Sequence, residues 1–142
     1  MAAMTKFQSF VEAVGRKLHN LNTDVLRVAL SNTAPVATQT VLDLVTNHPP
    51  PAAANGYPTG GNTPTNSGYT QTGGVGKLIL VDTVFTATAG GIGPFQYVIL
   101  YNDTAASNEL IGFYNYGSSI TLAVNETFTV DFDATNGVLT IT

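Results

Sequence analysis

The sequence predicts a mainly β protein: an antiparallel β-sandwich or jelly-roll-like domain with an N-terminal amphipathic helix and a long Pro/Gly-rich arm. Three observations support this prediction. Residues 77–142 consist of short apolar or alternating runs between turn signals, the pattern of sandwiches, jelly rolls and small barrels. Residues 5–19 repeat apolar side chains at the helical spacing of three and four. Residues 47–76 are rich in Pro and Gly, so the expected regions of one domain are residues 1–46, 47–76 and 77–142.

The helix expected at residues 5–19 has a single apolar stripe. Thr5 followed by Gln8 fits a capping box, and Arg16 and Lys17 lie at the end where the helix dipole favours cations. Gly15 weakens this helix by about 1 kcal/mol relative to Ala, so packing must stabilise it. The stripe consists of Phe7, Phe10, Val11, Val14 and Leu18.

Residues 24–31 alternate between two faces, which predicts a strand. A turn is expected at residues 32–35, which end in a proline. Residues 40–45 are expected to form either a short helix or another strand, because their periodicity fits both. The apolar face of the first strand consists of Leu26, Val28 and Leu30.

The Pro/Gly-rich residues 47–76 have few apolar groups to bury and are expected to form an arm or long loop. Fully extended, such a segment reaches roughly 100 Å, enough to fasten the subunit to a neighbour. Disorder is the alternative. Tyr57 and Tyr69 lie in this arm, where we expect them to anchor in a partner's pocket, with a carbohydrate platform as the alternative.

The C-terminal half is expected to be built of strands. Residues 78–87 are apolar on both faces, as in a strand that is covered on two sides. Asn136 and Gly137 predict a tight hairpin between the strand at residues 127–133 and residues 138–141. The other expected strands are residues 95–101, 109–116 and 120–124, with a turn at residues 102–108.

Charged residues make up only 10% of the chain, against about 25% in an average soluble domain. A surface of hydroxyl and amide groups can be buried against neighbours without desolvating ions. The net charge of −4 argues against nucleic-acid binding, which needs a basic stripe. Four of the five bases lie near the N-terminus, where their pattern favours a solvated helix face; contact with a partner is the alternative, with these bases as the candidate residues. They are Lys6, Arg16, Lys17 and Arg27.

No residue pattern predicts catalysis, a cofactor or a metal. The chain has no cysteine, and His19 and His48 lie at a helix end and beside three prolines, so no histidine dyad is expected. Residues 72–78 lack the glycine and hydroxyl of a phosphate-binding loop. Asp131 and Asp133 begin a calcium-like loop without its required Gly and Glu, which leaves a structural cation shared with Asp82 or Asp103 as an alternative. We therefore expect a protein that is not an enzyme, with no catalytic, cofactor-binding or metal-ligating residues.

The sequence resembles a family of small virion structural proteins encoded by tailed phages. The segments that carry the resemblance span most of the chain and are most specific in its C-terminal half. They are residues 24–35 (Asp-Val-Leu-Arg-Val-Ala-Leu-Ser-Asn-Thr-Ala-Pro), Asn55-Gly56-Tyr57, residues 93–104 (Gly-Pro-Phe-Gln-Tyr-Val-Ile-Leu-Tyr-Asn-Asp-Thr), residues 116–122 and residues 126–137.

The resemblance implies a capsid cement, or decoration, protein on the outer surface of the virion. Its expected partners are the major capsid protein and further copies of itself in a homo-oligomer, a trimer being one candidate. The alternative is a tail, baseplate or fibre component that binds host glycan. No membrane is expected, because no apolar run approaches the roughly 20 residues that span a bilayer.

Overall fold

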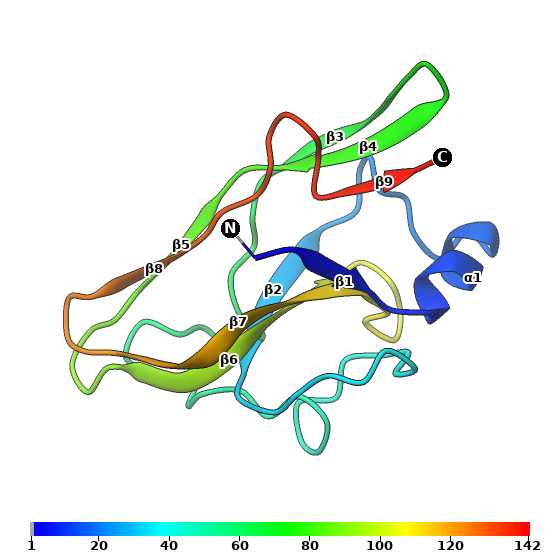
Figure 1. The fold of residues 1–142 in the computed structure, drawn as a ribbon. Helices are drawn as coiled ribbons and strands as arrows, with labels where there is room; N and C mark the ends of the chain where they lie inside the picture. The colour runs from blue at the N-terminus through cyan, green and yellow to red at the C-terminus, as the bar shows by residue number, and fades with distance from the viewer. Residues whose placement is uncertain (1) are drawn as a thin grey trace.

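The computed structural model describes residues 2–142, and its strands and sheets make the protein mainly antiparallel β. Figure 1 shows the elements in two layers, with the single described helix at one end. In chain order they are β1 (Met4–Lys6), α1 (Ser9–Gly15), β2 (Leu26–Ser31), β3 (Asn66–Thr72), β4 (Val75–Leu80), β5 (Thr83–Thr86), β6 (Ile92–Asn102), β7 (Leu110–Leu122), β8 (Thr127–Val130) and β9 (Leu139–Ile141).

One layer is a four-stranded sheet in the order β1-β7-β6-β2, with every pair antiparallel. The long strands β6 and β7 form its centre and are joined by the turn that the sequence predicts at residues 102–108. β2 pairs with β6 along its whole length, from Leu26 opposite Asn102 to Ser31 opposite Tyr97. The strand predicted at residues 24–31 is therefore confirmed.

The other layer is one long ribbon with an interruption. β4 and β5 follow each other directly, and β9 and β8 run antiparallel beside them. Between β8 and β9 the chain bulges out, and two hydrogen bonds fix the ends of this loop. Phe132 N–H donates to the side-chain Oδ1 of Asp82 (2.8 Å), and Val138 N–H donates to the Leu78 carbonyl (2.8 Å). β3 pairs with β4 on the outer side.

Two predictions for this layer are wrong. Residues 78–87 do not form one strand, because the pairing breaks at residues 81–82 and gives β4 and β5. Asn136 and Gly137 do not close a hairpin, because β8 pairs with β5 and β9 pairs with β4. The Asn-Gly pair instead turns the chain within the loop, where both Thr135 and Asn136 donate a backbone hydrogen bond to Asp133 Oδ1.

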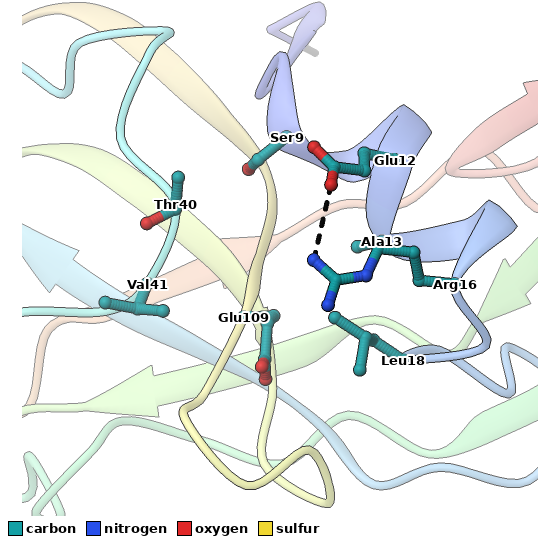
Figure 2. A pocket seen from close by; sticks show the side chains of 8 residues that line it. All are labelled: Ser9, Glu12, Ala13, Arg16, Leu18, Thr40, Val41 and Glu109. Carbon is teal, nitrogen blue, oxygen red and sulfur yellow. Dashed lines mark hydrogen bonds and ion pairs between the residues drawn. The ribbon is translucent and has the colours of Figure 1, made fainter.

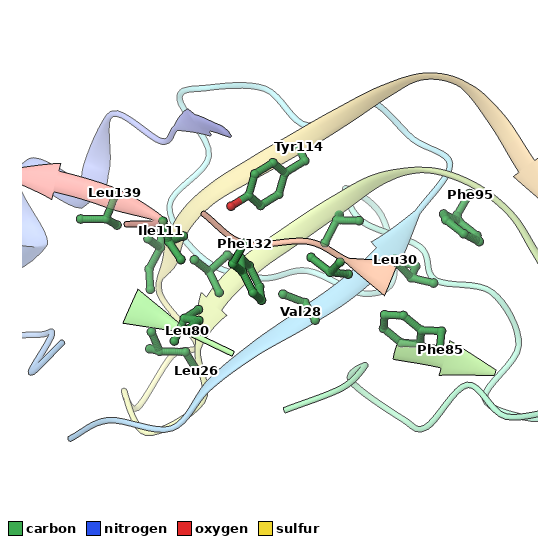
Figure 3. Close-up of a cluster of buried hydrophobic side chains, with 14 of the residues drawn as sticks. Leu26, Val28, Leu30, Leu80, Phe85, Phe95, Ile111, Tyr114, Phe132 and Leu139 are labelled. Carbon is green, nitrogen blue, oxygen red and sulfur yellow. The ribbon is translucent and has the colours of Figure 1, made fainter. Parts of the chain in front are cut away.

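The main hydrophobic core lies between the two layers (Figure 3). β2, β6 and β7 contribute one side, and β4, β5, β8 and β9 contribute the other. Each fully buried large aliphatic or aromatic side chain contributes about 1.5–3 kcal/mol relative to its exposed state. The contributors include Leu26, Val28, Leu30, Leu80, Phe85, Phe95, Ile111, Tyr114, Phe132 and Leu139.

A second apolar cluster lies on the other face of the four-stranded sheet. It contains Ile99 and Tyr101 of β6 and packs against Leu42, which belongs to the long irregular segment of residues 32–65. In Figure 1 this segment, coloured cyan to teal, runs beneath the sheet. Both faces of β2 and β6 are consequently covered.

The predicted arm is not observed as an arm. Residues 47–65 fold back on the domain, where His48 is buried and Tyr57 lies in the main core, and residues 66–76 belong to the β3–β4 hairpin. The many glycines allow this compact path, since Gly56, Gly60 and Gly61 all adopt positive φ angles.

The N-terminal helix is much shorter than predicted. Met4–Lys6 form a strand instead, with Thr5 opposite Phe113 of β7. Gln8 is the N-cap of α1 and no side chain caps this end, so the predicted capping box is wrong. Sheet pairing satisfies the backbone of residues 4–6 better than one more isolated helical turn would. Residues 40–45 form neither predicted element and contribute only a bridge between Val41 and Glu109.

Candidate functional site

Tyr57 is a core residue. Only 2% of it is exposed, its ring stacks on Phe85 at 5.6 Å between centroids, and its hydroxyl accepts the backbone N–H of Leu30 at 3.0 Å. Burial raises the pKa of Tyr57 to about 12, because the charged form would lose its hydration. The expectation that Tyr57 reaches into a partner's pocket is therefore wrong.

Arg27 is held within the chain. Its guanidinium donates to the carbonyls of Thr59 and Gly61, both at 2.7 Å, and lies 3.9 Å from the Asp103 carboxylate. An arginine that already binds two carbonyls and a carboxylate fastens residues 59–61 to β2. The expected role of Arg27 in contacting a partner has no support from this placement.

Residues 57–62 cover the free edge of β2. Val28 and Asn62 exchange both backbone hydrogen bonds, at 2.9 and 3.1 Å, and Tyr57 caps the N–H of Leu30. Edge strands with unpaired N–H and C=O groups can pair with other chains, and this cover prevents such pairing. The segment that was expected to fasten a neighbour therefore fastens its own sheet.

The other expected contact residues gather around α1. Lys6 and Lys17 lie at the two ends of a groove between α1 and β9, and Tyr69 lines its wall. The groove consists of two hollows of about 290 and 380 Å³ that share Val14 and Ile141, and we name it the α1–β9 groove. Its surface is largely apolar, and Val11 at its rim is 61% exposed.

Arg16 lines a different hollow, of about 190 Å³, on another side of α1 (Figure 2). Its guanidinium pairs with Glu12 at 3.3 Å, and both side chains are well exposed, so the pair contributes little to stability. Glu109 enters from the start of β7, and its Oε2 is buried without a hydrogen-bond partner. Ser9 Oγ donates to the carbonyl of Gln39 at 3.3 Å.

The two histidines belong to separate buried networks. His19 Nδ1 lies 3.0 Å from Asn102 Nδ2, which also donates to Asp24 Oδ2. His48 Nδ1 accepts the N–H of Asp43 at 3.1 Å, so its Nε2 carries the proton that is donated to Gln39 Oε1 at 2.9 Å. Burial lowers the pKa of both His19 and His48, and the nearby carboxylates oppose this effect.

The acidic residues singled out in the sequence are distributed over three places. Asp82 and Asp131 line a hollow of about 470 Å³ beside Ile79 and Val81, which we name the acidic hollow. Asp133 accepts backbone hydrogen bonds from the turn at residues 135–136, which hold the pKa of its carboxyl below the usual value. Asp103 lies with Arg27. Within residues 2–142 no three His, Asp or Glu side chains are placed to hold a metal ion.

Sequence reasoning missed the buried polar residues. Asn102 is fully buried, and its Oδ1 accepts the N–H groups of Thr104 and Ala105. Glu109 Oε2 is also buried, although the sequence pattern indicates only that a strand begins near this residue. The Asn-Asp-Thr order at a strand end is a signal for such an Asx turn. The position of Glu109 beside α1 carries no local signal, since it depends on how β7 meets the helix.

Comparisons with known proteins assign no family to the chain. No protein-family model, curated protein or solved structure matches the chain. No helix among residues 2–142 has the length and apolar character needed to cross a bilayer.

Proposed function

We propose that the chain is a structural subunit of a tailed-phage particle, and specifically a capsid cement protein on the outer capsid surface. The observation that carries the proposal is an exterior that is poor in charge and rich in exposed aliphatic groups. Val45 is 88% exposed and Val36 is 54% exposed. Such a surface can be buried against neighbours at a small desolvation cost.

The fold supports a mechanical role in this proposal. We propose that the two layers form a β-sandwich, with residues 32–65 as a third covering of its four-stranded sheet. Coverage of both sheet faces leaves a rigid body with few mobile apolar groups. A rigid body transmits load between capsid subunits, and binding to the mature shell stabilises the shell by mass action.

The alternative of a glycan-binding tail or fibre component is less well supported. It relied on Tyr57 and Tyr69 as an exposed stacking platform. Tyr57 is buried, and the ring of Tyr69 lies over Gly76, where a side chain would collide with it. The two tyrosines therefore offer no shared exposed surface for a sugar.

The test is to measure the protein in purified phage particles. Quantitative mass spectrometry of gradient-purified capsids should find it at a fixed ratio to the major capsid protein. Particles that lack it should lose their DNA at a lower temperature, and adding back the purified protein should restore heat resistance. Absence from purified particles would overturn the proposal.

Deleting residues 47–76 is unsuitable for this test, because the deletion removes Tyr57, β3 and the cover of β2. Surface variants keep the fold intact. Val45→Asp and Val36→Asp alter exposed side chains in the covering segment, and Thr38→Asp is a matched control that adds the same charge at an exposed polar site. A loss of capsid binding with the valine variants alone would show that this segment faces the shell.

A further inference from the structure

The α1–β9 groove combines an apolar floor with two lysines that have no carboxylate partner. Ion pairs within residues 2–142 join only Arg16 to Glu12 and Arg27 to Asp103. Lys6 and Lys17 are therefore unneutralised, and both are exposed at the ends of the groove. A surface of this kind fits an occupant that carries apolar and acidic groups together.

The acidic hollow has the complementary composition. Asp131 is exposed and unpaired within residues 2–142, and Asp82 uses one oxygen to accept the N–H of Phe132. Val81 beside them is 49% exposed, and no base lines the hollow. Two lysines with valines on one surface thus match two aspartates with a valine on the other.

The two surfaces share no residue, and Ile79 of the acidic hollow projects from the face of the β3-β4-β9 sheet opposite to that of Tyr69 and Ile141 in the groove. Tyr69 lies opposite Leu78, and Ile141 lies opposite Gly76, so Tyr69 and Ile141 share the face of the buried Leu78. Ile79, which lines the acidic hollow, is the next residue along β4 and points the other way. A copy that is bound through its groove can therefore still present its hollow.

We propose that the α1–β9 groove of one copy docks on the acidic hollow of a second copy of this chain. The inference rests on the proposed function, since it names the neighbour and the contact that a structural subunit would use. The contact is head-to-tail, so it closes into a ring or continues as a filament, and it differs from a two-fold dimer. Burial of the valines contributes affinity, while the lysine–aspartate pairs set orientation and exclude other arrangements.

The test is a charge swap measured by sedimentation equilibrium of the purified protein at low salt. Lys17→Glu and Asp131→Lys each place like charges across the contact, and each should weaken association by about ten-fold or more. The double variant restores opposite charges in reversed order, so it should associate within about three-fold of the unaltered chain. Association of the unaltered chain should also weaken as salt rises.

Matched controls add the same charge elsewhere. Thr33→Glu with Thr38→Glu matches Lys17→Glu, and Thr33→Lys with Thr38→Lys matches Asp131→Lys, at exposed positions that line neither surface. These controls should associate like the unaltered chain. Circular dichroism melting identifies a variant that fails to fold, and Lys17→Gln or Asp131→Asn then takes its place.

Three results would overturn the inference: an unaltered chain that stays monomeric at low salt, single variants that associate as well as their controls, or a double variant that is not rescued. The proposed function fails on a different measurement, since it depends on the presence of the protein in particles. A chain that associates as described but is absent from particles would keep this inference and remove the capsid role.

Discussion

Gly61 shows how one residue determines the path of the covering segment. It lies where residues 57–62 run beside β2, with a φ of +86°. A Cβ at this position would collide with the carbonyl of Val28, which accepts a hydrogen bond from Asn62. Only glycine satisfies both the positive φ and this close approach of two backbones.

Gly61→Ala should therefore destabilise the protein by more than about 2 kcal/mol, because steric collision adds to the cost of a left-handed backbone. Gly73→Ala is the matched control: its φ is +61°, and its Cβ would meet nothing within 4 Å. In the control, the free energy of unfolding should fall only by the cost of a left-handed backbone, about 1–2 kcal/mol. Urea denaturation measures both, and equal losses would show that the close approach does not matter.

Single residues were also where sequence reasoning was least reliable. Tyr57 stands in a Pro/Gly-rich stretch that looks solvated, and its partner Phe85 is 28 positions away, so no local pattern reveals the stacking. Arg27 was grouped with the terminal bases by position alone, whereas its carbonyl partners lie more than thirty residues later. Long-range contacts of this kind leave no periodic trace in the chain.

At the scale of elements, α1 ends in a Schellman motif that carries an unfavourable residue. Leu18 N–H donates to the carbonyl of Ala13, and Lys17 N–H donates to that of Val14. Lys17 occupies the left-handed position with a φ of +64°, where glycine is preferred. Gly15 is meanwhile the last residue of α1 and has a helical conformation, for which alanine is preferred.

Placing the preferred residue at each of these two positions should stabilise the helix. Gly15→Ala and Lys17→Gly should each raise the free energy of unfolding by about 0.5–1 kcal/mol, since a Cβ at Gly15 meets nothing within 4 Å. Thermal melting at high salt, which suppresses association, measures the gain. Lys17→Ala is the control, because alanine keeps the left-handed strain; a gain from this variant would contradict the explanation.

The strand β2 was predicted well because its alternation is local and strong. The turn between β6 and β7 was also predicted. Pairing could not be predicted in the same way. Asn136-Gly137 has the composition of a hairpin turn, yet the partners of β8 and β9 are strands that lie more than forty residues earlier. Turn residues specify a local change of direction, whereas burial of Phe132 and Leu139 in the shared core determines which strands meet.

At the scale of the whole molecule, the four-stranded sheet is covered on both faces, and two buried histidines lie at its margins. His48 holds residues 39 and 43 of the covering segment together, and His19 joins Asn102 at the end of β6. Both networks require an unprotonated Nδ1, since that atom faces a donor. The covering of the sheet should therefore depend on pH.

Burial lowers the pKa of His19 and His48 in the folded state below the unfolded value of about 6.5. As pH falls below about 6.5, the unfolded chain binds protons first, so the free energy of unfolding should decrease between about pH 7 and 5. The pKa of Asp43 is also lowered, by backbone hydrogen bonds, and its effect appears only below its ordinary value of 3.8. The pH range in which the two histidines change the free energy of unfolding is thus separate from the range of Asp43.

Denaturation curves at pH 7 and pH 5 measure this loss. His48→Gln should reduce the dependence of the free energy of unfolding on pH, because it removes one of the two titrating groups. The double variant with His19→Gln should reduce this dependence further. An unchanged slope in the double variant would mean that other groups titrate in this range.

The pairing of β1 with β7 also determines when the sheet can close during synthesis. Met4 lies opposite Tyr114, so β1 stays unpaired until more than a hundred further residues have been synthesised. β2 likewise lacks its partner β6 until residue 102 has been made. This sheet therefore cannot close before residue 114 has been made, and until then the nascent chain exposes its apolar strands to chaperones.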